Sequence, residues 1–206
     1  MHKFFNLEEE KQQRILNAAL KEFSQKGYMN ASTNEIVKEA QISKGLLFHY
    51  FQNKKALYLF LYDHFLNIVL EEFFAKLDHN ERDFLKILKN SILLKMELMH
   101  KYPHLFQFFL TVYQEDAPEV KKELEKRNLN LVSETYEKLL QNADVSLFKE
   151  GIDTGRAIHC IIWTMEGFSN HHYAKIKHLS LEEIRWDEVL EEADQYIELL
   201  RKSFYR

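Results

Sequence analysis

Apolar residues recur along most of this chain at the three- and four-residue spacing of amphipathic helices. In residues 7–26, for example, Ile15, Ala19 and Phe23 fall on one helical face, and Gly27 stands where a helix stop is expected. The same spacing predicts about nine helices. They are expected at residues 7–26, 32–40, 43–51, 53–77, 82–101, 103–113, 118–140, 147–177 and 187–204, with a loop or short turn at 178–186.

Capping residues mark several of these helix boundaries. Ser32 and Glu35 have the S-x-x-E spacing of a capping box. Ser43 and Asn53 are suited to cap the next two helices, because their side-chain oxygens can accept hydrogen bonds from the first-turn N–H groups. Pro103 fits the first position of a helix, where its missing N–H costs nothing.

The composition strengthens the helical interpretation. Only five glycines and two prolines occur in 206 residues, and no alternating run of β-branched residues is found. The apolar runs are shorter than the roughly 20 residues that span a bilayer, and the N-terminus lacks the features of a signal peptide. Cys160 is the only cysteine, so no intrachain disulfide can form. The sequence therefore predicts an all-α, cytoplasmic protein with no membrane role.

The charge is unevenly distributed along the chain. The net charge is −4, yet residues 1–55 carry nine lysines and arginines against six acidic residues, and the remainder carries 19 against 26. A basic N-terminal part on an acidic body suits a protein that binds nucleic acid, although surface charge divides unevenly in most proteins.

Residues 35–57, EIVKEAQISKGLLFHYFQNKKAL, have the pattern of a helix-turn-helix. The helical pattern breaks at residues 41–43 and restarts at once, which gives two short helices joined by a short turn. Lys44 and Gly45 begin the second helix. Backbone N–H groups and a lysine at a helix start bind phosphate, and a glycine lets a DNA backbone approach closely. The segment therefore indicates a DNA-binding surface.

This segment resembles the TetR/AcrR-type family of bacterial transcriptional repressors. The resemblance covers about residues 10–60 and implies an all-α homodimer with a helix-turn-helix head at 1–53. It also implies an effector-binding and dimerisation body at 54–206, in which a small molecule releases the DNA. The residues that carry it are Thr33, Glu35, Ile36, Ile42, Ser43, Lys44, Gly45, Leu47, Tyr50, Phe51, Lys54 and Leu57.

The resemblance implies specific DNA contacts and shows two departures. Gln41 replaces the usual turn glycine and must either adopt a left-handed conformation or shift the turn, and Phe48 replaces the usual tyrosine. For Tyr50 the alternative is a core aromatic that braces the hairpin, and for the lysines it is an ordinary solvated side chain. The DNA-contacting residues implied by position are Thr33, Ser43, Lys44, Gly45, Phe48, His49, Tyr50 and Lys54.

The body offers candidates for an effector pocket and a dimer interface. A mainly apolar pocket with a few polar side chains would take an apolar or aromatic molecule, such as a fatty acyl species or a drug. The effector candidates are Met96, His100, Phe106, Phe109, Tyr113, Trp163 and Glu166. The last two helices are apolar on more than one face, which suggests pairing with a symmetry mate. Their candidate dimer residues are Ile158, Ile162, Met165, Val189, Ala193, Tyr196 and Leu200.

Three alternative functions stay open. Glu97, His100 and His104 have metal-like spacing, which would suit a metal-sensing regulator, although no second such motif accompanies them. The chain lacks the common nucleophile, phosphate-loop, dinucleotide and zinc-protease motifs, so we expect no enzyme activity and no cofactor. A helical small-molecule-binding protein or enzyme without a DNA role, and a module that binds protein, are the remaining alternatives. The preferred prediction is a repressor that binds a palindromic double-stranded DNA operator.

Overall fold

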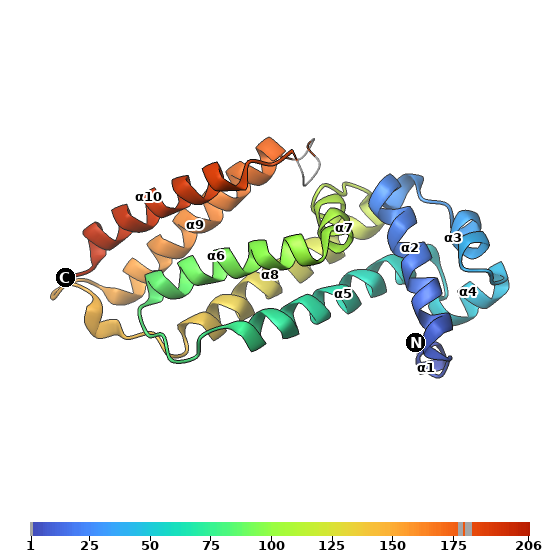
Figure 1. Ribbon diagram of the computed structural model, residues 1–206, viewed down its shortest axis with the longest axis horizontal. Helices are drawn as coiled ribbons and strands as arrows, with labels where there is room; N and C mark the ends of the chain where they lie inside the picture. Colours follow the sequence, from blue (N-terminus) through green and yellow to red (C-terminus); the bar gives the residue numbers. More distant parts are fainter. Residues whose placement is uncertain (1, 177–178, 180–182) are drawn as a thin grey trace. The chain divides into compact units, whose positions relative to one another are not determined.

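The computed structural model describes residues 2–176, 179 and 183–206 (Figure 1). Within these residues the regular structure is ten α-helices and one 3-10 turn, with no β-strand, so the predicted all-α class is confirmed. The helix beyond the predicted nine is the four-residue α1. The elements are α1 (His2–Phe5), α2 (Glu9–Asn30), α3 (Thr33–Glu39), α4 (Lys44–Phe51), α5 (Lys54–Lys76), α6 (Phe84–Lys101), α7 (Pro103–Tyr113), α8 (Pro118–Leu140), η1 (Val145–Leu147), α9 (Thr154–Ile176) and α10 (Trp186–Phe204).

Several predicted caps are confirmed. Ser43 Oγ accepts a hydrogen bond from the backbone N–H of Leu46 at 3.2 Å, at the start of α4. Asn53 Oδ1 accepts from the N–H of Ala56 at 2.8 Å, at the start of α5. Pro103 is the first residue of α7. Two short polar side chains and a proline therefore set these boundaries, as their local chemistry requires.

The predicted capping box at Ser32 and Glu35 is wrong. The Ser32 side chain makes no capping hydrogen bond, and its backbone N–H instead donates to Glu22 Oε1 at 2.8 Å. Glu22 is buried and also pairs with Lys26 at 2.9 Å. A carboxylate from α2 thus satisfies the N–H that precedes α3, and no sequence spacing within residues 32–35 could reveal it.

The predicted helix at 147–177 starts too early. Residues 145–147 form a 3-10 turn and α9 begins only at Thr154. The chain is extended at Phe148, which forms a bridge with Tyr205 and packs ring against ring at 4.8 Å. Gly151 then takes a positive φ of 77°. The predicted connection at 178–186 lies partly outside the described residues.

The chain folds as two compact units. The first comprises residues 1–75 and 98–131, and the second comprises residues 76–97 and 132–206. These units follow packing, whereas the predicted division at residues 53 and 54 concerns function and stays a prediction. No helix in the described part of the chain is long and apolar enough to cross a bilayer.

In the first unit, α2 packs on α3 and α7, and it is interrupted at Gly27. Gly27 has a φ of 66° and a ψ of −177°, so the predicted break is present, although one further turn reaches Asn30. The N–H of Tyr28 donates to Glu115 Oε2 at 2.6 Å, and Thr111 Oγ1 donates to the carbonyl of Ser24 at 3.1 Å. Polar groups around the break are therefore satisfied by residues of α7 and the turn after it.

In the second unit, α9 and α10 lie side by side (Figure 1). Asp83 ties the start of α6 to α10. Asp83 Oδ1 accepts from the N–H of Leu85 at 3.0 Å, and Asp83 Oδ2 accepts from Arg201 Nη1 at 2.8 Å. Burial acts to raise the pKa of Asp83, but the hydrogen bonds from Arg201 and from the N–H of Lys86 outweigh it and lower the pKa. The ionised pair therefore stabilises this unit.

Candidate nucleic-acid interface

The turn between α3 and α4 depends on Gln41. Its φ is 54°, so of the two predicted outcomes it takes the left-handed conformation in place of the usual glycine. The N–H of Gln41 donates to the carbonyl of Lys38 at 3.2 Å, and the N–H of Ile42 to that of Val37 at 3.0 Å. The hairpin is held from within by four fully or almost fully buried side chains: Ile36, Ala40, Leu47 and Phe51.

The N-terminal end of α4 is open to solvent. Ser43, Lys44 and Gly45 are all exposed, and a Cβ placed on Gly45 would meet nothing within 4 Å. Among the described residues, the backbone N–H groups of Lys44 and Gly45 have no hydrogen-bond partner. Helix N-termini carry partial positive charge, so these groups and the Lys44 ammonium form a site suited to a phosphate.

Several basic side chains in this region have acidic partners. Arg14, Lys21 and Lys26 pair with acidic residues at about 3 Å, and Lys55 pairs with Glu123. In the described part of the chain, Lys38 and Lys44 form no ion pair, and both are exposed. Lys38 was not among the predicted contacts, and its charge beside the turn is the signal that could have identified it.

The aromatic run on α4 is divided between surface and core. His49 is exposed and Phe48 is half-buried, with Lys44 Nζ 6.0 Å from the Phe48 ring centre. Tyr50 is only 7% exposed, and its ring packs edge-on against Phe4 at 6.1 Å. The structure therefore favours the alternative interpretation of Tyr50 as a brace for the hairpin, and leaves His49 as the more available side chain.

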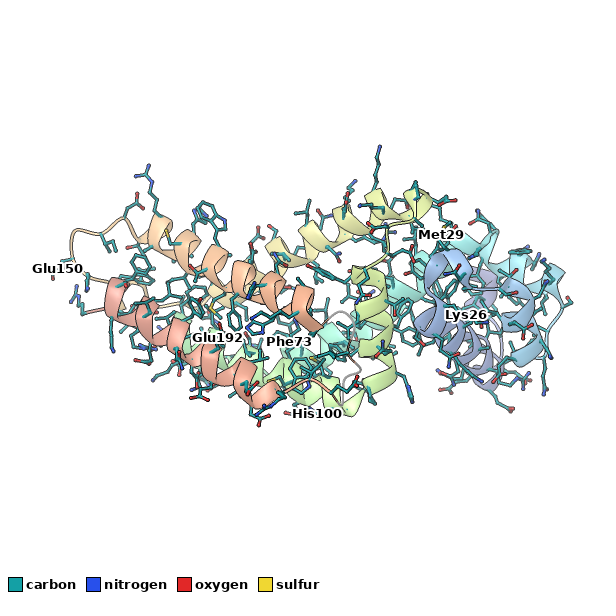
Figure 2. All side chains as sticks on the ribbon, turned by 90° about the horizontal axis from the view of Figure 1, so that it is seen from above. Lys26, Met29, Phe73, His100, Glu150 and Glu192 are labelled. Atoms are coloured by element: carbon teal, nitrogen blue, oxygen red, sulfur yellow. The ribbon has the colours of Figure 1, made fainter. Side chains whose placement is uncertain are left out.

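The two outer phosphate candidates differ in their availability. Thr33 is the first residue of α3 and is half-buried. Lys54 Nζ donates to the carbonyl of Met29 at 3.1 Å and lies 4.8 Å from the centre of the Tyr28 ring. Met29, at the C-terminal end of α2, is labelled in Figure 2. Burial lowers the pKa of Lys54, while Glu115 opposes that shift. Lys54 thus holds the end of α2, a structural role that sequence did not predict.

A protein-family model matches the residues that form the helix-turn-helix. The model described as "Bacterial regulatory proteins, tetR family" matches residues 15–61, which include α3 and α4. At residues 15–61 the chain is similar to the tetR family.

A curated relative is similar over part of the chain. The HTH-type transcriptional regulator RutR from Escherichia coli O157:H7 is 33% identical over 126 residues, which are 60% of this chain and 58% of RutR. The chain therefore covers less than two thirds of the length of that relative.

Solved structures of regulators share the fold. A TetR-like transcriptional regulator from Rhodococcus sp. RHA1 has a TM-score of 0.64 at 17% identity, over 91% of this chain and 93% of that one. The regulator FadR from Bacillus subtilis has a TM-score of 0.58 at 18% identity, over 91% and 96%. These proteins are all named as regulators, which supports the prediction that this chain is not an enzyme.

The predicted effector residues have different environments. In the first unit Phe106 is buried, Phe109 is half-buried, and His100 and Tyr113 are exposed. In the second unit Met96 and Glu166 are half-buried, and burial raises the pKa of Glu166. Trp163 is 65% exposed and stacks on His159 at 5.6 Å, so it lies on an exposed face of α9.

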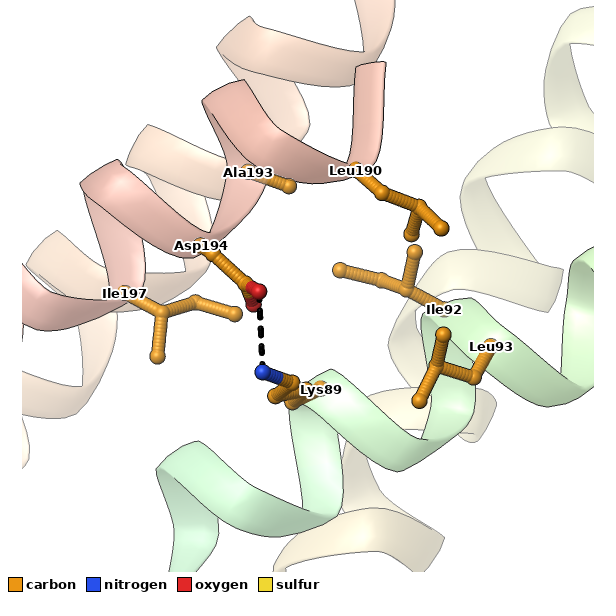
Figure 3. Close-up of a pocket in the computed structure, with 7 residues that line it drawn as sticks. All are labelled: Lys89, Ile92, Leu93, Leu190, Ala193, Asp194 and Ile197. Carbon is orange, nitrogen blue, oxygen red and sulfur yellow. Dashed lines mark hydrogen bonds and ion pairs between the residues drawn. The ribbon is translucent and has the colours of Figure 1, made fainter. Parts of the chain in front are cut away.

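A small pocket in the second unit lies between α6 and α10 (Figure 3). Its volume is about 40 Å³, whereas pockets for drug-sized ligands are roughly 300–1,000 Å³. Lys89 of α6 and Asp194 of α10 both line this pocket, and they form an ion pair at 2.9 Å. None of the predicted effector residues is in its lining, which consists of Lys89, Ile92, Leu93, Leu190, Ala193, Asp194 and Ile197.

The predicted dimer residues also divide into two groups. Met165, Ala193 and Leu200 are buried within the protomer, so they build its core. Tyr196 is exposed and Ile158, Ile162 and Val189 are half-buried. Two exposed apolar side chains, Trp163 on α9 and Leu199 on α10, were missing from this prediction. Helical spacing alone could not separate the face that packs inside from the face that is exposed.

The predicted metal set is not assembled. Glu97 Oε1 pairs with Lys76 Nζ at 2.5 Å. Over residues 2–176, 179 and 183–206, no group of three His, Cys, Asp or Glu side chains is arranged to hold a metal ion. The Glu97, His100 and His104 alternative therefore gains no support.

Proposed function

We propose that this chain is a TetR-type transcriptional repressor whose head binds a palindromic operator and whose body binds a small molecule that releases the DNA. The supporting observation is the open N-terminal end of α4. Glycine in a helix costs about 0.5–1 kcal/mol relative to alanine, yet nothing in the protein crowds Gly45. A partner that approaches the backbone from outside, such as a phosphate strand, accounts for it.

The chain would act as a homodimer. The exposed parts of α9 and α10, including Trp163, Tyr196 and Leu199, provide apolar surface for a symmetry mate. Two-fold symmetry would place two copies of α4 in successive major grooves about 34–36 Å apart, or at a longer spacing. A palindromic operator follows from that symmetry, with Lys44 and the helix start on phosphates and His49 and its neighbours towards base edges.

An apolar or aromatic molecule is the proposed effector. FadR from Bacillus subtilis, which shares the fold, was solved in complex with stearoyl-CoA, so a fatty acyl species is the first class to test. The effector can release DNA only by binding the DNA-incompetent conformation more tightly. Acyl-CoA and drug panels should therefore be scored for operator release as well as for binding.

The decisive experiment is binding of the full chain to genomic fragments, followed by fluorescence anisotropy on the recovered site at low salt and at about 300 mM salt. Lys44→Ala should weaken binding and reduce the slope of log affinity against log salt by about 0.9, since one phosphate contact is lost. Lys126→Ala is the matched control, because Lys126 is also an exposed helical lysine.

Equal behaviour of the two variants would rule out Lys44 as a phosphate contact. No salt-sensitive binding by the folded wild-type chain, with or without the effector panel, would overturn the repressor proposal.

A further inference from the structure

The N-terminal segment, residues 2–7, reaches the last turn of α4 from outside the part of the chain that matches the family. Phe4 in α1 is fully buried. Its ring centre lies 5.0 Å from that of Phe51, 5.6 Å from that of Phe60 and 6.1 Å from that of Tyr50. Phe51 and Tyr50 belong to α4, and Phe60 belongs to α5. The Phe4 ring therefore fills the space between α4, which is the proposed recognition helix, and α5.

The backbone around Phe4 is held in place by hydrogen bonds. The N–H of Leu7 donates to the carbonyl of Phe4 at 3.1 Å. The side-chain amide of Gln12, on α2, donates to the carbonyl of Leu7 at 2.8 Å and to that of Phe5 at 3.3 Å. The segment is thus attached to α2 at one end and inserted into the aromatic cluster of Phe4, Tyr50, Phe51 and Phe60 at the other.

The position of this cluster matters because α4 is short. The helix has eight residues, and its exposed N-terminal end has no packing of its own at Lys44 and Gly45. Its C-terminal turn is the end that is fixed by packing, so a change of tilt there moves the exposed end. Base recognition requires side chains to be held within about 0.5 Å and 10–20° of the productive geometry.

We propose that Phe4 is a positioning residue for DNA recognition. By wedging the last turn of α4 against α5, it sets the tilt of the recognition helix and so the preference for the operator over other DNA. This inference rests on the proposed DNA-binding function. Phe4 itself touches no DNA.

The test compares two affinities of the full chain, one for the operator recovered from genomic fragments and one for a random duplex of equal length. Phe4→Ala should lower the ratio of these affinities by about tenfold, the cost of one misplaced base contact. Random-duplex binding should stay unchanged, because it depends on phosphate charge and not on helix tilt. Phe5→Ala is the matched control, since Phe5 neighbours Phe4 but is half exposed.

A purely structural role gives a different result. Loss of folded protein would lower both affinities equally and leave their ratio unchanged, which would overturn the inference while the repressor proposal stands. Phe4→Leu keeps an apolar side chain without the flat ring, so it decides the question if Phe4→Ala does not fold. An unchanged ratio in the folded Leu variant also overturns the inference. A wild-type chain with no operator preference would overturn the repressor proposal itself.

Discussion

The N-terminal and C-terminal ends of α4 differ in burial and in their contribution to the fold. At the N-terminal end Ser43, Lys44 and Gly45 are exposed, and the protein uses only the Ser43 side chain, as a cap. At the C-terminal end Tyr50 and Phe51 are buried in the aromatic cluster with Phe4 and Phe60. One end is therefore available to DNA and the other maintains the fold, within eight residues. Stability and DNA binding should respond separately to changes at the two ends.

The largest effect is expected from Phe51→Ala. Truncating a buried aromatic removes its transfer energy and leaves a cavity, which typically costs about 3–5 kcal/mol. Chemical denaturation should show a lower free energy of unfolding by that amount. Lys44→Ala should stay within about 0.5 kcal/mol of wild type, because it changes an exposed position. A similar loss of unfolding free energy in both variants would show that the two ends of α4 contribute equally to stability.

Gln41→Gly should stabilise the chain. Gln41 holds a positive φ of 54° in the turn before α4, and such a conformation costs a non-glycine residue about 1–2 kcal/mol. Glycine relieves this strain but is more flexible when unfolded, so a net gain of about 1 kcal/mol is expected. Thermal denaturation would measure it. A lower melting temperature would mean that the Gln41 side chain contributes contacts that offset the strain.

Gly45→Ala should separate stability from DNA binding, because the free energy of unfolding should rise while operator affinity falls. Alanine should raise the free energy of unfolding by about 0.5 kcal/mol, since the helix gains a better helix former and the added Cβ meets nothing. Anisotropy should show weaker operator binding, because the Cβ occupies space that the DNA backbone needs. Unchanged operator affinity would show that the DNA does not approach Gly45.

The smallest effect concerns pH and the buried end. His64 stacks on Phe60 at 5.5 Å, and burial lowers the pKa of its imidazole. The unfolded chain then binds a proton more readily than the folded chain, so stability is complete above the ordinary pKa and is lost as pH falls below about 6.5. In urea titrations from pH 7.5 to 5.5, His64→Phe should lose this part of the pH dependence. An identical slope in both proteins would contradict it.

Most of the helices could be predicted because local chemistry determines them. Scarce glycine and proline, the caps at Ser43 and Asn53, and Pro103 at a helix start all act within a few residues of the boundary they set. The left-handed Gln41 was also one of two stated outcomes.

The surroundings of several predicted site residues depend on partners distant in sequence. Tyr50 is buried because Phe4 lies against it. The Lys54 ammonium is occupied because it donates a hydrogen bond to the carbonyl of Met29. Trp163 was placed in a pocket although its face of α9 is exposed. Periodicity identifies an apolar stripe, but only tertiary packing decides which part of that stripe is covered.

The break at Gly27 bears on modularity. The Tyr28 amide is satisfied by Glu115 and the Ser24 carbonyl by Thr111, while the Tyr58 ring packs on Phe108 at 5.7 Å. A fragment cut after residue 61 would lose all three partners and expose the core beneath α2. Residues 15–61 are therefore not a unit that can be moved alone into another protein. Any chimera would have to carry α7 and the turn after it.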